Sequence, residues 1–165
     1  MTRRRSQAFI SYRRETGADV ARLVKSVLSS RGIETFLDVD DIGASHFDDR
    51  LLRAIEECPN FILVLSANSL DRCSREGDWL RREIAHAIAT ERNIIPLYQA
   101  GFRFPDSDEL PNEIRDLPRY NAVEYNHTYF EATMGKLERF LVDELEEPGA
   151  REGSGTIRQH VTTEK

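Results

Sequence analysis

Cysteine is scarce in this sequence of 165 residues, since only Cys58 and Cys73 occur. Two cysteines cannot build the disulfide framework of a small secreted domain, and by themselves they cannot complete a metal site. The basic residues 1–5 are followed by neither an apolar segment nor a small-residue cleavage site, so they do not form a secretory signal. We therefore expect a cytoplasmic protein with reduced thiols and no bound metal.

Long apolar runs and an excess of positive charge are also missing. The best apolar run, residues 61–65, has the length of a strand and is far shorter than the ~18 residues of a membrane helix. There are 23 Lys and Arg against 29 Asp and Glu, for a net charge of -6. Because a nucleic-acid-binding protein usually presents a basic face, we expect neither direct nucleic-acid binding nor membrane binding. Local arginine pairs such as Arg13-Arg14 can still meet one small anionic ligand.

Glycine-rich phosphate-binding motifs are absent. Residues 11–17 have neither the glycine spacing and Lys-Ser/Thr pair of a P-loop nor the G-x-G-x-x-G of a dinucleotide-binding loop. A phosphoryl-accepting receiver site would need acidic residues where this chain has Tyr12-Arg13-Arg14. No Ser-His-Asp or Cys-His arrangement stands out either, so the familiar nucleophilic machinery is not indicated.

Strand and helix patterns alternate along the chain. Short apolar segments predict five strands, and apolar residues at helical spacing predict five helices. We place residues 16–19 in a capping turn and residues 101–120 mostly in a loop that holds one short helix. The strands are expected at 8–12, 33–39, 61–65, 93–98 and 122–124, and the helices at 20–30, 47–58, 78–90, 109–116 and 129–145.

This alternation predicts an α/β fold of the flavodoxin-like class, a five-stranded parallel sheet with helices on both faces. In such sheets ligands bind beyond the carboxyl ends of the strands. Residues 1–145 are expected to form this domain. Residues 146–165 combine glycine and scattered charges with few large apolar side chains, which indicates a flexible linker or tail leading to a sensor module absent from this chain.

Two of the loops at the carboxyl edge are rich in charge. Arg13 and Arg14 follow the first strand, where they could meet ligand phosphates or simply form a solvated loop. The segment 38–47 contains three carboxylates, which could cap the following helix. The residues alone leave these alternatives open.

A third feature lies at the start of the helix expected from residue 78. Trp79 and Glu83 are four residues apart, so they share one face of that helix. An aromatic ring beside a carboxylate suits a sugar-like ligand that develops positive charge. The alternative places Trp79 in the core and Glu83 in a surface ion pair with a neighbouring arginine.

Five segments in register carry a resemblance to a known protein family. With their order and spacing, the sequence from about residue 6 to residue 145 resembles a TIR (Toll/interleukin-1 receptor) domain. The likeness is greatest to the NAD-cleaving members of that family, which include an animal axon-degeneration enzyme with sterile-alpha motifs and bacterial effectors. The segments are Phe9-Ile10-Ser11-Tyr12-Arg13-Arg14, Phe36-Leu37-Asp38-Val39, residues 61–66, Asp78-Trp79 with Glu83-Ile84, and residues 93–96.

The resemblance implies cleavage of NAD+ between nicotinamide and ribose, with NAD+ as the substrate and no further cofactor. Glu83 matches the catalytic glutamate of the enzymatic members, which adaptor-type members often lack. The same resemblance implies which residues bind NAD+: they are Phe9, Tyr12, Arg13, Arg14, Asp38, Gly43, Ser45 and Trp79.

The segment 39–47 matches a mobile loop of the family, which gates the pocket and contributes to self-association between TIR domains. Here the chain departs from the pattern, since Ser45 stands where a close relative has glycine and Gly43 lies two residues earlier. The loop before Asp78 is also shorter.

Three functions follow as hypotheses. The first is an NAD+ glycohydrolase that releases nicotinamide and linear or cyclic ADP-ribose, as the effector of a defence or cell-death system activated by oligomerisation. The second is a non-catalytic TIR adaptor that assembles with other TIR domains. The third is a nucleoside-processing enzyme of similar fold, such as a base-exchange transferase.

Overall fold

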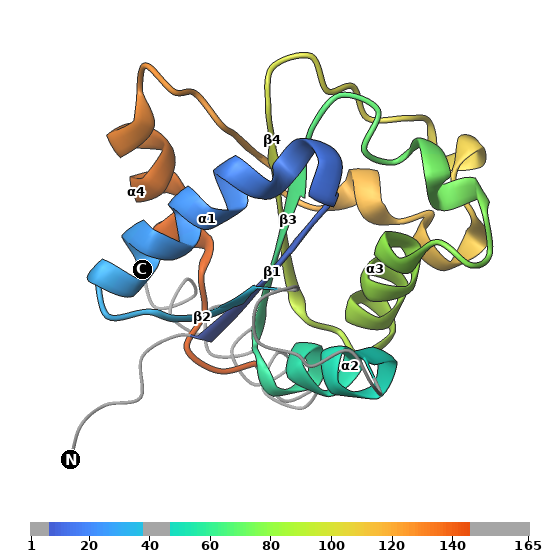
Figure 1. Cartoon of the computed structure of the whole chain (residues 1–165), viewed down its shortest axis with the longest axis horizontal. Coiled ribbons are helices and arrows are strands. Elements are labelled where there is room, and N and C mark those ends of the chain that lie inside the picture. Colours follow the sequence, from blue (N-terminus) through green and yellow to red (C-terminus); the bar gives the residue numbers. More distant parts are fainter. Residues whose placement is uncertain (1–6, 38–46, 146–165) are drawn as a thin grey trace, which may run out of the picture.

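The structure is a computed structural model that describes residues 7–37 and 47–145. Its strands are β1 (Gln7–Tyr12), β2 (Glu34–Leu37), β3 (Asn60–Leu65), β4 (Asn93–Tyr98) and β5 (Val123–Glu124). They form one parallel five-stranded sheet in the order β2-β1-β3-β4-β5 (Figure 1). The predicted fold class is confirmed. The chain first adds β2 on one side of β1 and then adds β3, β4 and β5 on the other side. The order of the strands therefore changes direction between β1 and β3, and ligands are expected beyond the carboxyl ends of these two strands.

Helices cover both faces of the sheet (Figure 1). One face carries α1 (Arg14–Ser30) and α4 (Phe130–Phe140), and the other carries α2 (Phe47–Glu57) and α3 (Trp79–Ala89). Successive residues of β1 alternate between the two layers, with Ala8 and Ile10 packed on the first face and Phe9 on the second. Two apolar cores therefore hold the sheet from both sides. None of the helices that the structure describes is long and apolar enough to cross a membrane.

Helix α1 begins at Arg14, so the predicted turn at residues 16–19 is wrong. The carbonyl oxygen of Arg13 accepts hydrogen bonds from the amides of Thr16 and Gly17, at 3.2 and 2.7 Å, so the helix starts directly where β1 ends. Gly17 is buried, and a Cβ atom at this position would lie 3.1 Å from the Cβ of Tyr12. The glycine therefore permits close packing of α1 on β1, and it does not mark a turn.

Helix α4 ends at Phe140, before the predicted limit of residue 145. The side chain of Asn60 accepts a hydrogen bond from the amide of Val142 at 2.9 Å and donates to its carbonyl oxygen at 2.8 Å. Asn93 donates to the carbonyl oxygen of Phe140, also at 2.8 Å. These asparagines satisfy the backbone beyond the helix, so its apolar spacing continues without helical structure.

The segment between β4 and β5 contains three 3-10 turns where the sequence predicts one helix at 109–116. They span Ser107–Glu109, Asn112–Ile114 and Leu117–Arg119. Pro111 and Pro118 lack the amide hydrogens that a continuous helix requires. The described residues therefore contain four α-helices, one fewer than predicted.

Candidate functional site

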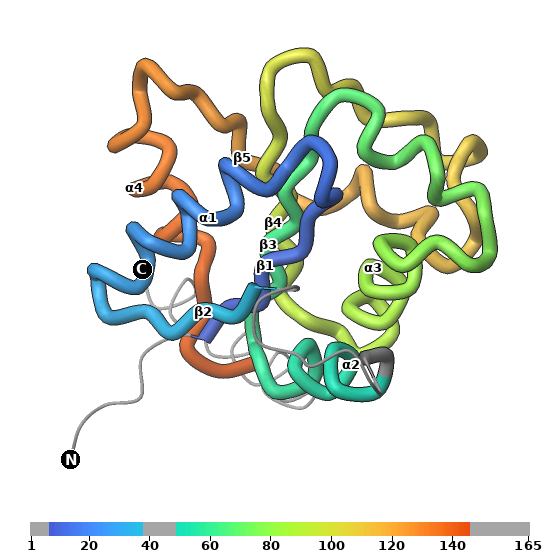
Figure 2. Tube along the Cα trace, viewed as in Figure 1, coloured from blue at the N-terminus to red at the C-terminus, as the bar shows by residue number. Residues whose placement is uncertain are grey.

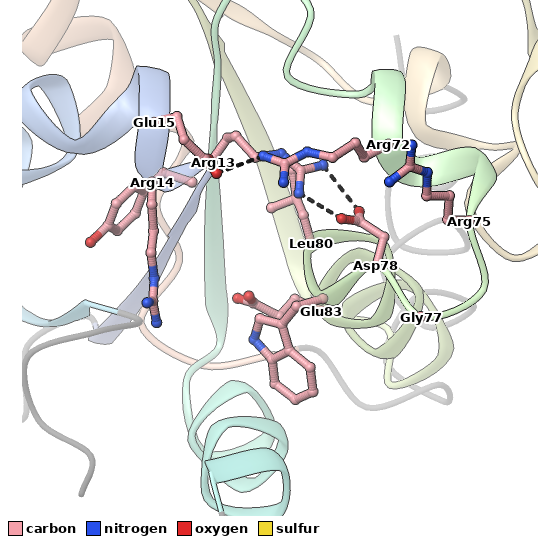
Figure 3. Close-up of a pocket in the computed structure, with 11 residues that line it drawn as sticks. Arg13, Arg14, Glu15, Arg72, Arg75, Gly77, Asp78, Leu80 and Glu83 are labelled. Carbon is pink, nitrogen blue, oxygen red and sulfur yellow. Dashed lines mark hydrogen bonds and ion pairs between the residues drawn. The ribbon is translucent and has the colours of Figure 1, made fainter. Parts of the chain in front are cut away.

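A pocket of about 610 Å³ opens beyond the carboxyl end of β1, beside the first turns of α1 and α3 (Figure 3). Figure 2 shows that the chain passes from β1 to α1 next to the loop that leads from β3 to α3. The pocket therefore lies at the edge of the sheet where the fold class places ligands. The residues that line it are Tyr12, Arg13, Arg14, Glu15, Arg72, Arg75, Gly77, Asp78, Trp79, Leu80 and Glu83.

Most of the described residues that the sequence analysis selected meet in this pocket. Tyr12, Arg13 and Arg14 come from the junction of β1 with α1, and Trp79 and Glu83 come from α3. Their proximity is a property of the fold, because the two groups are far apart in the sequence. Of the other selected residues, Asp38, Gly43 and Ser45 lie outside the described residues, as does most of the loop at 39–47.

Phe9 does not line the pocket. Its side chain is 1 % exposed and its ring stacks on that of Phe61, with 5.9 Å between the ring centroids. Phe9 lies three residue steps before Tyr12, which is about 10 Å along an extended strand. The structure therefore places Phe9 in the apolar core and away from the site to which the resemblance assigned it.

Glu83 occupies the wall of the pocket in the first half of α3. The helix begins at Trp79, where Asp78 caps it by accepting a hydrogen bond from the amide of Arg81 at 3.1 Å. Glu83 is 0 % exposed, so it is not the surface residue of the alternative interpretation. In Figure 3 its carboxylate points toward the side of the pocket where Arg14 lies.

The sequence left open whether Trp79 lies in the core or lines a ligand pocket, and the structure shows both. Its ring packs against the apolar core between the sheet and α3, and it also lines the pocket. The guanidinium carbon of Arg82 lies 4.9 Å from the centre of the ring, which is a cation–π distance.

Arg13 is occupied by contacts within the protein. Its guanidinium donates to both carboxylate oxygens of Asp78, at 2.6 and 3.0 Å (Figure 3). It also donates twice to the carbonyl oxygen of Ser69, at 3.0 and 2.8 Å. The Arg13 and Asp78 side chains are 10 % and 7 % exposed. Burial alone would raise the pKa of Asp78, but the hydrogen bonds from Arg13 and from the Arg81 amide outweigh it, so this pKa lies below its ordinary value.

Three other arginines line the pocket. Arg14 lies in the first turn of α1, and Arg72 and Arg75 lie in the loop before α3, where all three are exposed. Arg72 also pairs with Glu15 at 2.8 Å, and the hydrogen bond from Arg72 lowers the pKa of that carboxyl. The sequence analysis missed Arg72 and Arg75, although their place in the loop after β3 could have indicated them.

The pocket therefore combines a buried carboxylate, an aromatic ring and several arginines, on a chain whose net charge is -6. This arrangement suits a ligand with a sugar or cationic part at one end and phosphates at the other. Within residues 7–37 and 47–145, no group of three or more His, Cys, Asp or Glu side chains could hold a metal ion.

Most of the chain matches a known family of protein domains. The family model described as "TIR domain" matches residues 8–137. The chain is 42 % identical over 149 residues to the NAD(+) hydrolase tir-1 of Caenorhabditis elegans, which covers 88 % of this chain and 15 % of that protein. It is 40 % identical over 136 residues to the NAD(+) hydrolase SARM1 of Danio rerio, with 81 % and 19 % covered. The chain thus spans less than a fifth of the length of either relative.

Among solved structures, the fold is similar to that of the TIR domains in the activated Roq1 resistosome, which directly recognises the pathogen effector XopQ. The TM-score is 0.65 at 14 % identity, and the match covers 81 % of this chain and 98 % of the other. At this identity the similarity shows the fold alone.

Proposed function

Because the chain belongs to the TIR domain family, we propose that it is an NAD+ glycohydrolase, which converts NAD+ and water to nicotinamide, ADP-ribose and a proton. The relatives named NAD(+) hydrolases support this proposal. The observation that carries it is the buried carboxylate of Glu83 in a pocket that Trp79 and several arginines also line.

The chemistry needs few protein groups. Nicotinamide is a cationic pyridinium while it is bonded to ribose, and it leaves as a neutral molecule when the C1′–N bond breaks. No general acid has to protonate this leaving group, in contrast to ordinary glycoside hydrolysis with its two carboxylates. The barrier lies in forming a ribose with oxocarbenium character, to which water then adds at C1′ with loss of a proton to solvent.

In this proposal Glu83 holds the ribose hydroxyls and stabilises the positive charge that develops on the sugar. A carboxylate already fixed in a buried position needs little reorganisation when this charge appears, so its stabilisation is large. Arg14, Arg72 and Arg75 bind the pyrophosphate, and the ring of Trp79 packs near the ribose or the base. No cofactor is required.

The proposal is tested by the substitution Glu83→Gln, which removes the charge and keeps the size of the side chain. We expect the rate of nicotinamide release to fall at least about 10²-fold, because a major electrostatic stabiliser is lost. Release is measured by chromatography at high protein concentration or under crowding. Glu83→Ala is a second variant, since a helix accepts alanine readily.

The matched control is Glu131→Gln, which removes an exposed carboxylate on α4 that pairs with Arg31 at 3.0 Å. It should leave the rate unchanged. Release by Glu83→Gln at the parent rate would show that the site is wrongly assigned. A parent protein that releases no nicotinamide even when clustered would favour the non-catalytic adaptor.

The biological setting is also a proposal. We propose that the domain is the effector of a defence or cell-death system, activated by oligomerisation, with the segment 39–47 of one copy meeting its neighbour. The similarity to TIR domains of an activated resistosome supports such assembly. The free thiols of Cys58 and Cys73 are compatible with work in the cytoplasm. The product is linear ADP-ribose when water adds at C1′, and cyclic ADP-ribose when a nitrogen of the adenine ring adds there instead and releases a proton without consuming water. Mass spectrometry of the reaction mixture distinguishes the two.

A further inference from the structure

The two adjacent arginines after β1 have opposite environments. Arg13 is 9 % exposed and directed into the protein, whereas Arg14 is exposed in the first turn of α1. We propose that Arg13 is a positioning residue, which holds the first turn of α3 so that Glu83 meets the ribose, and that Arg14 contributes to phosphate binding. This inference rests on the proposed function.

The contacts of Arg13 connect three segments of the chain. Its guanidinium joins the end of β1 to the carbonyl oxygen of Ser69 in the loop after β3 and to the carboxylate of Asp78 at the start of α3. It also lies 3.8 Å from the sulfur of Cys73, whose thiol donates to Asp78 at 3.4 Å. A bidentate pair with planar geometry fixes orientation as well as distance. The loop and the helix start are thus held against the strand.

Asp78 transmits this restraint to the catalytic carboxylate. It caps α3 through the amide of Arg81, so a shift of Asp78 changes where the helix begins. Glu83 follows five residues later, about 7.5 Å along the same helix axis. A helix over this length moves nearly as a rigid body, so a small displacement of its first turn is passed on to Glu83. A misplacement of about 1 Å can lower a catalytic rate by about 10²-fold.

The same contacts separate the roles of the two arginines. A residue that binds phosphate contributes equally to the ground state and the transition state, so its loss raises KM and leaves kcat nearly unchanged. Loss of a residue that only positions Glu83 lowers kcat and leaves KM nearly unchanged. Because both carboxylate oxygens of Asp78 and the Ser69 carbonyl already engage Arg13, a bound pyrophosphate would have to compete with them.

The experiment uses Arg13→Met and Arg13→Lys beside Arg14→Ala, in the full chain. For both Arg13 variants we expect kcat to fall about 10- to 100-fold with little change in the KM for NAD+. Arg14→Ala should raise KM instead. The control is Arg31→Met, which removes an arginine that pairs with Glu131 and Glu138 on α4. It should leave kcat and KM at the parent values.

The fluorescence emission maximum of Trp79 reports on the first turn of α3, and a loss of stability alone would not change it in the folded protein. It is the single tryptophan of the chain and follows Asp78 directly. Its emission maximum in the folded protein should shift in Arg13→Met and Arg13→Lys, and stay at the parent value in the control. Far-UV circular dichroism establishes that each variant is folded at the assay temperature.

The double variant Arg13→Met/Asp78→Asn keeps the proposal testable if the single Arg13 variants fail to fold. Removing one partner leaves a buried charge without compensation, whereas removing both avoids that cost, and asparagine still caps the helix. We expect the double variant to be folded and still reduced in kcat, because the link between β1 and α3 is gone.

Two results would overturn the inference. A rise in KM with kcat retained in the Arg13 variants would make Arg13 a phosphate ligand, and parent values of kcat, KM and Trp79 emission would leave it a purely structural residue. Failure of the proposed function gives a different pattern, since the parent itself then releases no nicotinamide. The Trp79 emission of the Arg13 variants still tests the positioning in that case.

Discussion

Arg13 and Arg14 are identical residues in neighbouring positions, yet one side chain is buried and the other is exposed. Arg13 has extended backbone angles, φ −81° and ψ 120°, and Arg14 is the first residue of α1. The change from strand to helix between them sends the two side chains in different directions. Sequence analysis could identify the pair as a candidate for anion binding, but it could not show which arginine is enclosed by Ser69 and Asp78.

The low pKa of Asp78 leads to a prediction at this scale. A carboxylate whose pKa is lower in the folded than in the unfolded protein stabilises the fold above its unfolded pKa, and this contribution is lost as pH falls through the folded value. Asp78→Asn should therefore lower the free energy of unfolding at neutral pH. The difference from the parent should shrink progressively as the pH falls below about 5, where unfolded carboxylates begin to bind protons.

Urea denaturation at several pH values measures this difference. Asp116→Asn is the control, since it removes an exposed carboxylate 3.5 Å from Arg119, and an exposed pair of this kind contributes little at any pH. A difference for Asp78→Asn that stays constant with pH would contradict the role given to its ionised form.

At the scale of helices and strands, the boundary of an element can be predicted from sequence when the residues that cause it are near it in the chain. The start of α3 was predicted correctly because Asp78 caps it through an amide three residues away, which is a local signal. The start of α1 was not, because Gly17 looks like a turn residue and is in fact a packing residue. The end of α4 depends on Asn60, which is 82 residues from Val142, so no local pattern could reveal it.

Glycines in two helices give a matched pair for a prediction about packing. A Cβ atom at Gly17 in α1 would lie 3.1 Å from Tyr12 and 3.5 Å from Val64, whereas a Cβ atom at Gly135 in α4 would meet nothing within 4 Å. We expect Gly17→Leu to destabilise the fold by about 1–3 kcal/mol through overpacking. Gly135→Ala should stabilise it by about 0.4–1 kcal/mol, because alanine restricts the unfolded chain.

Urea denaturation at neutral pH measures the change in the free energy of unfolding for both substitutions. Equal effects of the two substitutions, or a more stable Gly17→Leu, would mean that α1 does not pack on β1 as closely as described.

The whole molecule places the pocket on one edge of the sheet, at the carboxyl ends of the strands. The opposite edge is bound by the asparagines that hold the chain after α4, where Asn60 also donates to the carbonyl oxygen of Gln7 at the start of β1.

Activation by oligomerisation predicts that activity depends on protein concentration. Nicotinamide release per molecule should rise with concentration and fall on dilution, because a site completed by a neighbour requires the assembled form. The measurement is the initial rate of nicotinamide release over a dilution series. The control is the same protein fused to an independent oligomerising helix, whose rate per molecule should stay constant on dilution. A rate per molecule that is constant over the series would rule out this mode of activation.

The sequence by itself determined the alternation of strands and helices, the parallel fold and the family segments, including the helix start that brings Trp79 and Glu83 onto one face. These follow from apolar periodicity and capping, which act within short windows of the chain. Tertiary structure alone decided that Phe9 belongs to the core and that Arg13 is enclosed by Ser69 and Asp78. The physical reason is that a side chain's partners lie on distant segments, and only packing of the sheet and its helices brings those segments together.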